Sequence, residues 1–330
     1  MMMAMLRFAK REYQLELVTP AFLGGADQSA QWRTAGIKAL IRQWWRVVWH
    51  AEHPTGTVSE MRNEEAVRFG RVQGTACKAR IMIRFDEEPN SPIKKIDYLR
   101  AKNQKDDMTF AYLGYGAFEG FNQQSKKTAI DKNSKIKFKI LIQAKDAIET
   151  AKFAQEIDQT MFLVHQFGAL GSRSNNAWGS LFITGDIQVQ DLTKYGKNLS
   201  QCLQSDWKQA ISKDHQGLMV WQTSPLNSTD DVMRRLKTFR KDGHNYIAKQ
   251  NGTRHLINAP VTLKNAPVRN NQNRYPSQFM LKILKEGIQY RGQVTLLAHK
   301  WHNDSHDLSG IINRIATDLD NNQNFSRITG

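Results

Sequence analysis

Alternating apolar and polar residues predict several half-buried strands. In residues 13–17 every second residue is apolar, and Pro20 follows as a stop signal. The same period of two recurs in residues 79–85 and 136–142, where lysine and arginine occupy several of the polar positions, and residues 181–189 also favour a strand. Since successive side chains of a strand point to opposite faces, the two basic segments should each bury an apolar face and expose a charged one.

Two segments show instead the three-to-four-residue spacing of amphipathic helices. The first, over residues 33–50, places on one face the apolar residues Ile37, Leu40, Ile41, Trp44 and Val48. The second covers residues 153–164. Strand, helix, two strands, helix and strand over residues 1–190 is the order of a βαββαβ, ferredoxin-like unit, here with a long insertion near residues 86–134.

The second half of the chain allows a degenerate copy of the same unit. Its pattern predicts a helix at residues 232–239, strands near 278–284 and 291–299, and a last amphipathic helix at 308–319. No sequence repeat establishes the duplication. We therefore predict an α+β chain of two ferredoxin-like (RRM-like) domains, residues 1–190 and 191–330.

The charge balance predicts a polyanionic partner. Lysine and arginine total 47 against 31 acidic residues, which gives a formal charge of +16. Residues 232–300 alone hold fourteen of the cations and only two acids, so this part should present the largest basic surface. The alternative is a generally basic surface without any single site.

Cysteine content and hydropathy narrow the class of partner. Cys77 and Cys202 are the two cysteines, and they form no CxxC pair. This excludes a disulfide scaffold and a thiolate zinc site, and it favours the reducing cytoplasm. We identify no secretory signal and no apolar run long enough to span a membrane. Nucleic acid is therefore the expected polyanion, and lipid is not.

The face of the first helix opposite its apolar stripe combines cations with indoles. It carries Lys38, Arg42, Trp45, Arg46 and Trp49. The cations would neutralise phosphates, and the indoles would stack on bases or on a partner subunit. The alternative is that Trp45 and Trp49 pack beneath the insertion at residues 86–134.

A glycine-rich segment lies between the second helix and the strand that follows it. Gly168, Gly171 and Gly179 permit a tight loop whose amides could hold phosphate oxygens, with Arg173 as the charge. No Gly-Lys-Ser/Thr follows, so the segment is not a Walker loop. An ordinary turn is the alternative.

Together these segments resemble the RAMP superfamily of CRISPR-associated RNA-binding proteins. The matching motifs are TPAFLGGAD at 19–27, WRTAGIKALIRQWWR at 32–46 and GALGSRSNNAWGSL at 168–181. Weaker matches are TFAYLGYG at 109–116 and RYPSQFMLKI at 274–283. Within the superfamily the chain is most similar to the first Cmr subunit family of type III-B effector complexes.

The resemblance implies two ferredoxin-like domains that bind guide RNA and target RNA among other subunits of a type III effector complex. It implies RNA contacts at Lys38, Arg42, Trp44, Trp45, Arg46, Gly171 and Arg173. Trp44 falls on the apolar face, which conflicts with that role. Where the family has glycines the chain has Ala169 and Ala177, and where basic residues are common it has Asn175 and Asn176. These departures weaken the loop as a phosphate site.

The histidines do not form a recognisable metal motif. His50 and His53 are three residues apart, and His299, His302 and His306 cluster near the C-terminus. A zinc site needs three or four convergent ligands, which these spacings do not supply. We expect neither a metal nor another cofactor.

The expected function is that of a noncatalytic, cytoplasmic RNA-binding subunit of a CRISPR ribonucleoprotein in antiviral defence. One alternative is a metal-independent endoribonuclease that processes guide-RNA precursors, with His165 or His50 as general base. No Tyr, Lys or second His is placed beside His165 by sequence spacing. Another alternative is a single-stranded nucleic-acid binder unrelated to CRISPR.

Overall fold

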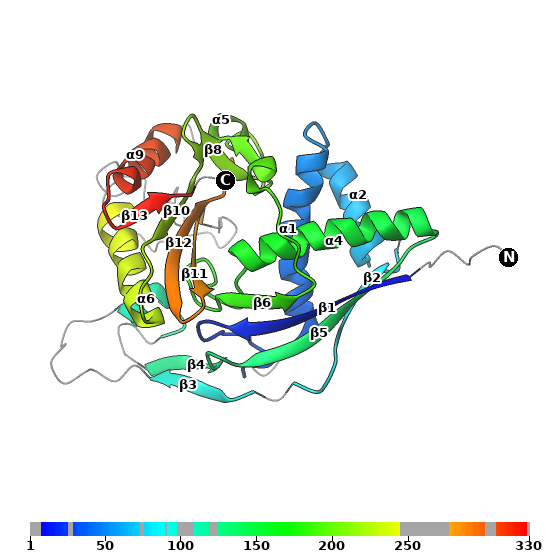
Figure 1. Ribbon diagram of the computed structural model, residues 1–330, viewed down its shortest axis with the longest axis horizontal. Coiled ribbons are helices and arrows are strands. Elements are labelled where there is room, and N and C mark those ends of the chain that lie inside the picture. Colours follow the sequence, from blue (N-terminus) through cyan, green and yellow to red (C-terminus); the bar gives the residue numbers. More distant parts are fainter. Residues whose placement is uncertain are drawn as a thin grey trace. The chain divides into compact units, whose positions relative to one another are not determined.

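The chain folds as a mixed α+β protein with several antiparallel sheets (Figure 1). The computed structural model describes residues 8–25, 29–72, 76–89, 91–97, 109–118, 124–244, 277–300 and 308–328. It divides into two compact units. Unit 1 comprises Met1–Ser174 and Trp178–Asp191, and unit 2 comprises Asn175–Ala177 and Leu192–Gly330. The predicted α+β class is confirmed.

Unit 1 is built on a four-stranded sheet with the order β2-β5-β1-β6, in which each neighbouring pair is antiparallel. Its strands are β1 (Phe8–Leu17), β2 (Ile81–Phe85), β5 (Lys135–Gln143) and β6 (Leu181–Gly185). Along β5 the residues Ile136, Phe138, Ile140 and Ile142 are buried, whereas Lys135 and Lys137 are exposed. The alternation therefore places one face of this strand in the core, as predicted.

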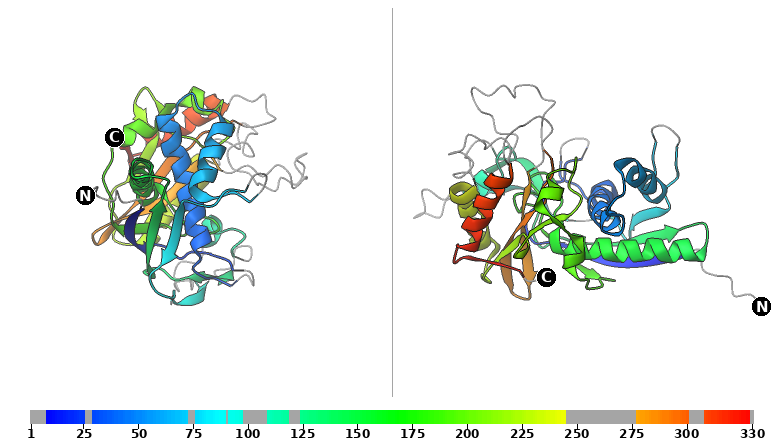
Figure 2. Two further views of the ribbon diagram at one scale, coloured as in Figure 1. Left: turned by 90° about the vertical axis from the view of Figure 1, so that its right-hand side faces the viewer. Right: turned by 90° about the horizontal axis from the view of Figure 1, so that it is seen from above.

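Two long helices pack against this sheet and against each other. They are α1 (Thr34–Glu52) and α4 (Ala147–Phe167), and both match the predicted amphipathic segments. A third helix, α2 (Val58–Phe69), lies beside α1 in both views of Figure 2. The hydrophobic pattern did not predict α2, although Thr57 and Glu60 form a capping box at its start.

The insertion between β2 and β5 adds a two-stranded sheet. It contains β3 (Ile93–Asp97), α3 (Thr109–Leu113) and β4 (Gln124–Ile130), and β3 pairs with β4 antiparallel. Residues 98–108 and 119–123 of the predicted insertion lie outside the described residues.

Unit 2 has a main sheet with the order β11-β12-β10-β13, again antiparallel throughout. Its strands and the two helices between them are β10 (Val220–Thr223), α6 (Thr229–Thr238), β11 (Phe279–Glu286), β12 (Gln289–Leu296), α9 (Leu308–Asp320) and β13 (Phe325–Arg327). The predicted helices and strands of the second half are confirmed.

Smaller elements complete unit 2. A second sheet contains β7 (Gly196–Asn198), β8 (Ile211–Asp214) and β9 (Gly217–Leu218). Short helical turns are η1 (Leu192–Tyr195), α5 (Leu199–Cys202) and η2 (Phe239–His244).

The main sheets of the two units share one topology. In each unit, helix α1 or α6 follows the first strand of the main sheet, and helix α4 or α9 separates its third strand from its fourth. Unit 1 has in addition α2 before its second strand and the insertion β3-α3-β4 after it. When the strands are counted along the chain, each sheet has the order second, third, first, fourth. None of the helices in the described ranges is both long and apolar enough to cross a bilayer.

Candidate nucleic-acid interface

A row of three cations runs along α1 on the side away from its apolar stripe. Lys38, Arg42 and Arg46 are half-buried, whereas Ile41 and its apolar neighbours on the stripe are buried. Residues four apart on a helix lie about 6 Å apart along its axis, so the row is regular.

One carboxylate from α2 holds two cations of this row. Glu65 accepts hydrogen bonds from Arg46 Nε at 2.8 Å, Arg46 Nη2 at 3.1 Å and Arg42 Nε at 3.2 Å. Burial of Glu65 opposes its ionisation, but the hydrogen bonds and charges of the two arginines hold its pKa below the usual value. Glu65 is therefore ionised at neutral pH and fixes both guanidinium groups.

Lys38 is the member of the row without an ion-pair partner among the described residues. Burial and, secondarily, the charge of Arg42 lower its pKa. Both effects disfavour the ammonium form of Lys38, and the negative charge of a bound anion would offset them.

Two hollows flank the exposed surface of α1. The α2-side hollow has a volume of about 370 Å³ and is lined by residues that include Lys38, Arg42, Arg71 and Val72. The loop-side hollow has a volume of about 500 Å³. It is lined by parts of the 22–24 segment, α1, β4 and the glycine loop, which is the glycine-rich segment at residues 168–179. Ala35 and Ala39 of α1 line both hollows. Arg71 was not predicted as a site residue.

The tryptophans do not belong to this surface, which corrects the prediction of an exposed indole face. Trp44 and Trp45 are 0% exposed and Trp49 is 4% exposed. Trp44 stacks on Phe167 of α4, with ring centroids 5.2 Å apart. Side chains that are buried in this way cannot stack on RNA bases.

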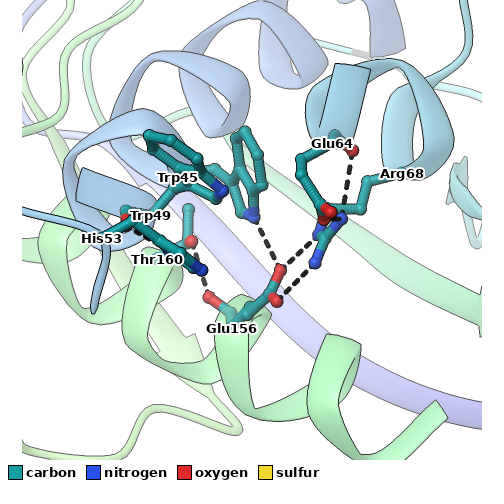
Figure 3. Close-up of polar contacts among 7 residues, drawn as sticks. All are labelled: Trp45, Trp49, His53, Glu64, Arg68, Glu156 and Thr160. Atoms are coloured by element: carbon teal, nitrogen blue, oxygen red, sulfur yellow. Dashed lines mark hydrogen bonds and ion pairs between the residues drawn. The ribbon is translucent and has the colours of Figure 1, made fainter. Parts of the chain in front are cut away.

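Trp45 takes part in a buried polar cluster between three helices (Figure 3). Its Nε1 donates to Glu156 Oε2 of α4 at 2.8 Å, and Arg68 of α2 donates to both oxygens of the same carboxylate. Arg68 also pairs with Glu64, one helical turn earlier. The indole is thus buried by α2 and α4, and not by the insertion that the alternative interpretation invoked.

The physical reason for this correction is that α1 is covered on two sides. A helical wheel drawn for α1 alone separates one apolar face from one polar face. Trp45 lies on the polar side of that wheel, but α2 packs there, with Phe69 in edge-to-face contact at 5.8 Å. A tryptophan on the polar side of the wheel therefore indicates a second packing surface on α1.

In the glycine loop, Gly171 has a conformation that requires glycine. Its φ is +90°, and a Cβ would lie 2.7 Å from the Phe22 carbonyl oxygen. That close approach brings the loop against the 22–24 segment, where Ser172 N–H donates to the Phe22 oxygen at 3.0 Å. Gly171 therefore lines the loop-side hollow.

Arg173 is exposed and its guanidinium lies against Gly116, where a Cβ would meet Nη2 at 2.3 Å. Two motifs of the resemblance, residues 109–116 and 168–181, thus meet in space. Ala177 has a φ of +68°, in the left-handed region that glycine favours. The amides of Ala177 and Leu281 tie the segment Asn175–Ala177 to β11 in unit 2.

The two histidines of the endoribonuclease alternative make packing contacts. His165 Nδ1 accepts the Ile183 N–H at 3.3 Å, and its ring contacts Phe182. His50 is 7% exposed and stacks beside Trp49. In the part of the chain that the structure describes, no group of three or more His, Cys, Asp or Glu could hold a metal, while His302 and His306 lie outside that part.

No protein-family model and no curated protein matches the sequence. Apo Cmr1 from Pyrococcus furiosus is similar with a TM-score of 0.51 and 14% identity, over 94% of this chain and 97% of that one. A chain of the type III-B Cmr-beta complex bound to cognate target RNA has a TM-score of 0.53 and 10% identity, over 93% and 99%.

This chain therefore has the fold of Cmr1, and the resemblance drawn from the sequence motifs is confirmed at the level of fold.

Proposed function

We propose that this chain is a Cmr1-like, noncatalytic RNA-binding subunit of a type III CRISPR effector complex. The observation that carries the proposal is the basic surface of α1, where Lys38, Arg42 and Arg71 line a hollow in a chain with the Cmr1 fold. Guide RNA, target RNA and other subunits are the proposed partners. The similar Cmr-beta complex is itself bound to target RNA, which supports this choice.

Each unit is proposed to be a ferredoxin-like domain, with residues 1–190 and 191–330 as the two domains. The shared order of the four strands in the two main sheets supports this assignment. The mean spacing between the α1 cations, about 6 Å, is close to that of successive phosphates on an extended strand, so the row can follow an RNA backbone.

The proposed RNA contacts are Lys38, Arg42, Arg46, Gly171 and Arg173. The two buried tryptophans of the motif, Trp44 and Trp45, contribute by positioning α1 and not by touching RNA. Glu65 neutralises one charge of the surface, and Arg42 donates to it through Nε. A charged, positioned guanidinium suits phosphate recognition.

Replacement of Lys38 and Arg42 by alanine should weaken binding of single-stranded RNA by about 1–3 kcal/mol and reduce the salt slope by about one to two units. Stability should change by only about 0.5 kcal/mol for Lys38, and by about 1 kcal/mol for Arg42, whose ion pair with Glu65 is lost while Arg46 still pairs with that carboxylate. RNA titrations at several salt concentrations and thermal melts measure the two effects.

A matched control removes the same charge from α4 and its preceding turn, where Lys145 and Lys152 are exposed. This double alanine variant should bind RNA nearly as the natural chain does. Equal losses in the two variants would show that only net charge matters. Normal binding by the Lys38/Arg42 variant would make the basic residues 232–300 the leading candidate for the RNA-binding surface.

The purified chain should not cleave labelled RNA at specific positions, with EDTA or with divalent cations. Neither His165 nor His50 lines either hollow, and both are packed against aromatic rings. Gel analysis of the incubated RNA tests this expectation. Specific cleavage that disappears in a His165→Ala variant would establish the endoribonuclease alternative.

A further inference from the structure

We propose that the loop-side hollow receives the base of one unpaired RNA nucleotide. This inference rests on the proposed RNA-binding function and adds a defined subsite to it. The hollow lies within unit 1, where the 22–24 segment, α1, β4 and the glycine loop converge.

The size of the hollow suits a single nucleotide. Its volume of about 500 Å³ lies in the range typical of small-molecule sites. It is too small for a duplex, which would have to lie outside it. A base rotated out of a single strand is therefore the part of RNA that can enter.

The chemistry of the walls also fits a base with its phosphate. Leu23, Leu40 and Leu170 provide apolar surface for the faces of a planar ring. Gln31 and Gln43 offer amide donors and acceptors of the kind that pair with base edges.

The charges around the same hollow favour the binding of an anion. Arg33 and Lys127 line it, and none of the described lining residues is acidic. Arg33 is the N-cap residue of α1 and makes no capping hydrogen bond through its side chain, and the first turn of the helix has no acid. A phosphate at the mouth of the hollow would meet these two cations.

Two glycines keep the hollow open although packing does not require them. A Cβ on Gly24 would meet nothing within 4 Å, and one on Gly36 would make only an ordinary contact with Leu23 at 3.9 Å. Neither residue has the positive φ that favours glycine. Because Gly36 is small, it leaves the hollow open, and a large side chain at this position would fill it.

The position of the hollow connects it with the cation row. Ala35 and Ala39 form a low ridge between the two hollows because both residues line each of them. A strand that crosses this ridge places one phosphate near Lys38 and Arg42 while the neighbouring nucleotide enters the loop-side hollow.

The test places a large side chain in the hollow by a substitution in α1. Gly36→Trp should fold and should bind a single-stranded RNA oligomer roughly 5- to 150-fold more weakly, the range expected for loss of one stacked base. Gly36→Ala is the matched control and should bind as the natural chain does. If Gly36→Trp does not fold, Gly24→Trp blocks the same space from a loop.

Photo-crosslinking locates the base. RNA that carries 4-thiouridine should crosslink to residues that line the hollow in the natural chain and in Gly36→Ala, and this crosslink should be lost in the filled variant. An oligomer of abasic ribose phosphates should bind the natural chain and the filled variant equally.

The outcomes separate this site from the proposed function. RNA binding that is equal in the natural chain and the filled variant, or crosslinks that map elsewhere, would overturn the nucleotide site alone. A natural chain that binds no RNA would overturn the proposed function, and the nucleotide site with it.

Discussion

Replacement of Glu156 by alanine should lower the free energy of unfolding by about 3–5 kcal/mol. The Glu156 and Arg68 side chains are 5% and 2% exposed, and two hydrogen bonds join them. The variant would leave the Arg68 guanidinium buried without its main counter-ion, and Trp45 Nε1 without its acceptor. Urea unfolding monitored by tryptophan fluorescence measures the loss.

Two further variants test this explanation. Glu64→Ala removes the other carboxylate on Arg68, but that side chain is 48% exposed, so the variant should lose no more than about 1 kcal/mol. Replacement of the pair by Arg68→Met and Glu156→Leu should restore most of the stability, because no buried charge is then left unpaired and Glu64 is largely exposed. A loss below about 1 kcal/mol in Glu156→Ala would contradict the assignment of a buried ion pair.

Replacement of Trp44 by alanine should destabilise the chain by about 3–5 kcal/mol and should leave the RNA affinity of the folded fraction unchanged. Trp44 is 0% exposed and stacks on Phe167, so its removal creates a cavity between α1 and α4. Trp44→Phe keeps an aromatic ring in place and should be less destabilising. Thermal melts and RNA titrations at low temperature separate the two properties.

The opposite result would restore the role that the family resemblance implied. If Trp44→Ala were as stable as the natural chain and yet lost RNA binding, the indole would have to reach RNA in solution. Because Trp44 is buried, we expect the variant to be destabilised and its folded fraction to bind RNA normally.

The buried cluster and the basic surface depend on each other through α2. Glu64, Glu65 and Arg68 all belong to this helix. Arg68 fixes α2 to α4 through Glu156, and Glu65 then reaches Arg42 and Arg46 on α1. The packing of α2 thereby determines how the guanidinium groups of Arg42 and Arg46 are oriented for contact with a phosphate.

The sequence by itself determined the strands and helices of both halves that have a clear period of side chains, although it did not determine α2 or several of the shorter strands. A strand with alternating residues, such as residues 136–142, or a helix with one apolar stripe, such as residues 308–319, is defined by the period of its own side chains. The motifs at residues 19–46 and 168–181 were also enough to indicate the fold that the solved structures share. Local spacing and short motifs are properties of contiguous residues, so no tertiary information was needed.

Only the tertiary structure decided which residues of α1 face solvent and what surrounds them. The sequence grouped Trp45 with Lys38, Arg42 and Arg46, but α2 and α4 bury the indole and leave the cations at the surface. The two hollows likewise arise from segments that are distant in sequence, such as Gly24 and Gly171. Burial and cavity shape depend on how separate elements pack, and the period of one helix contains no information about its second neighbour.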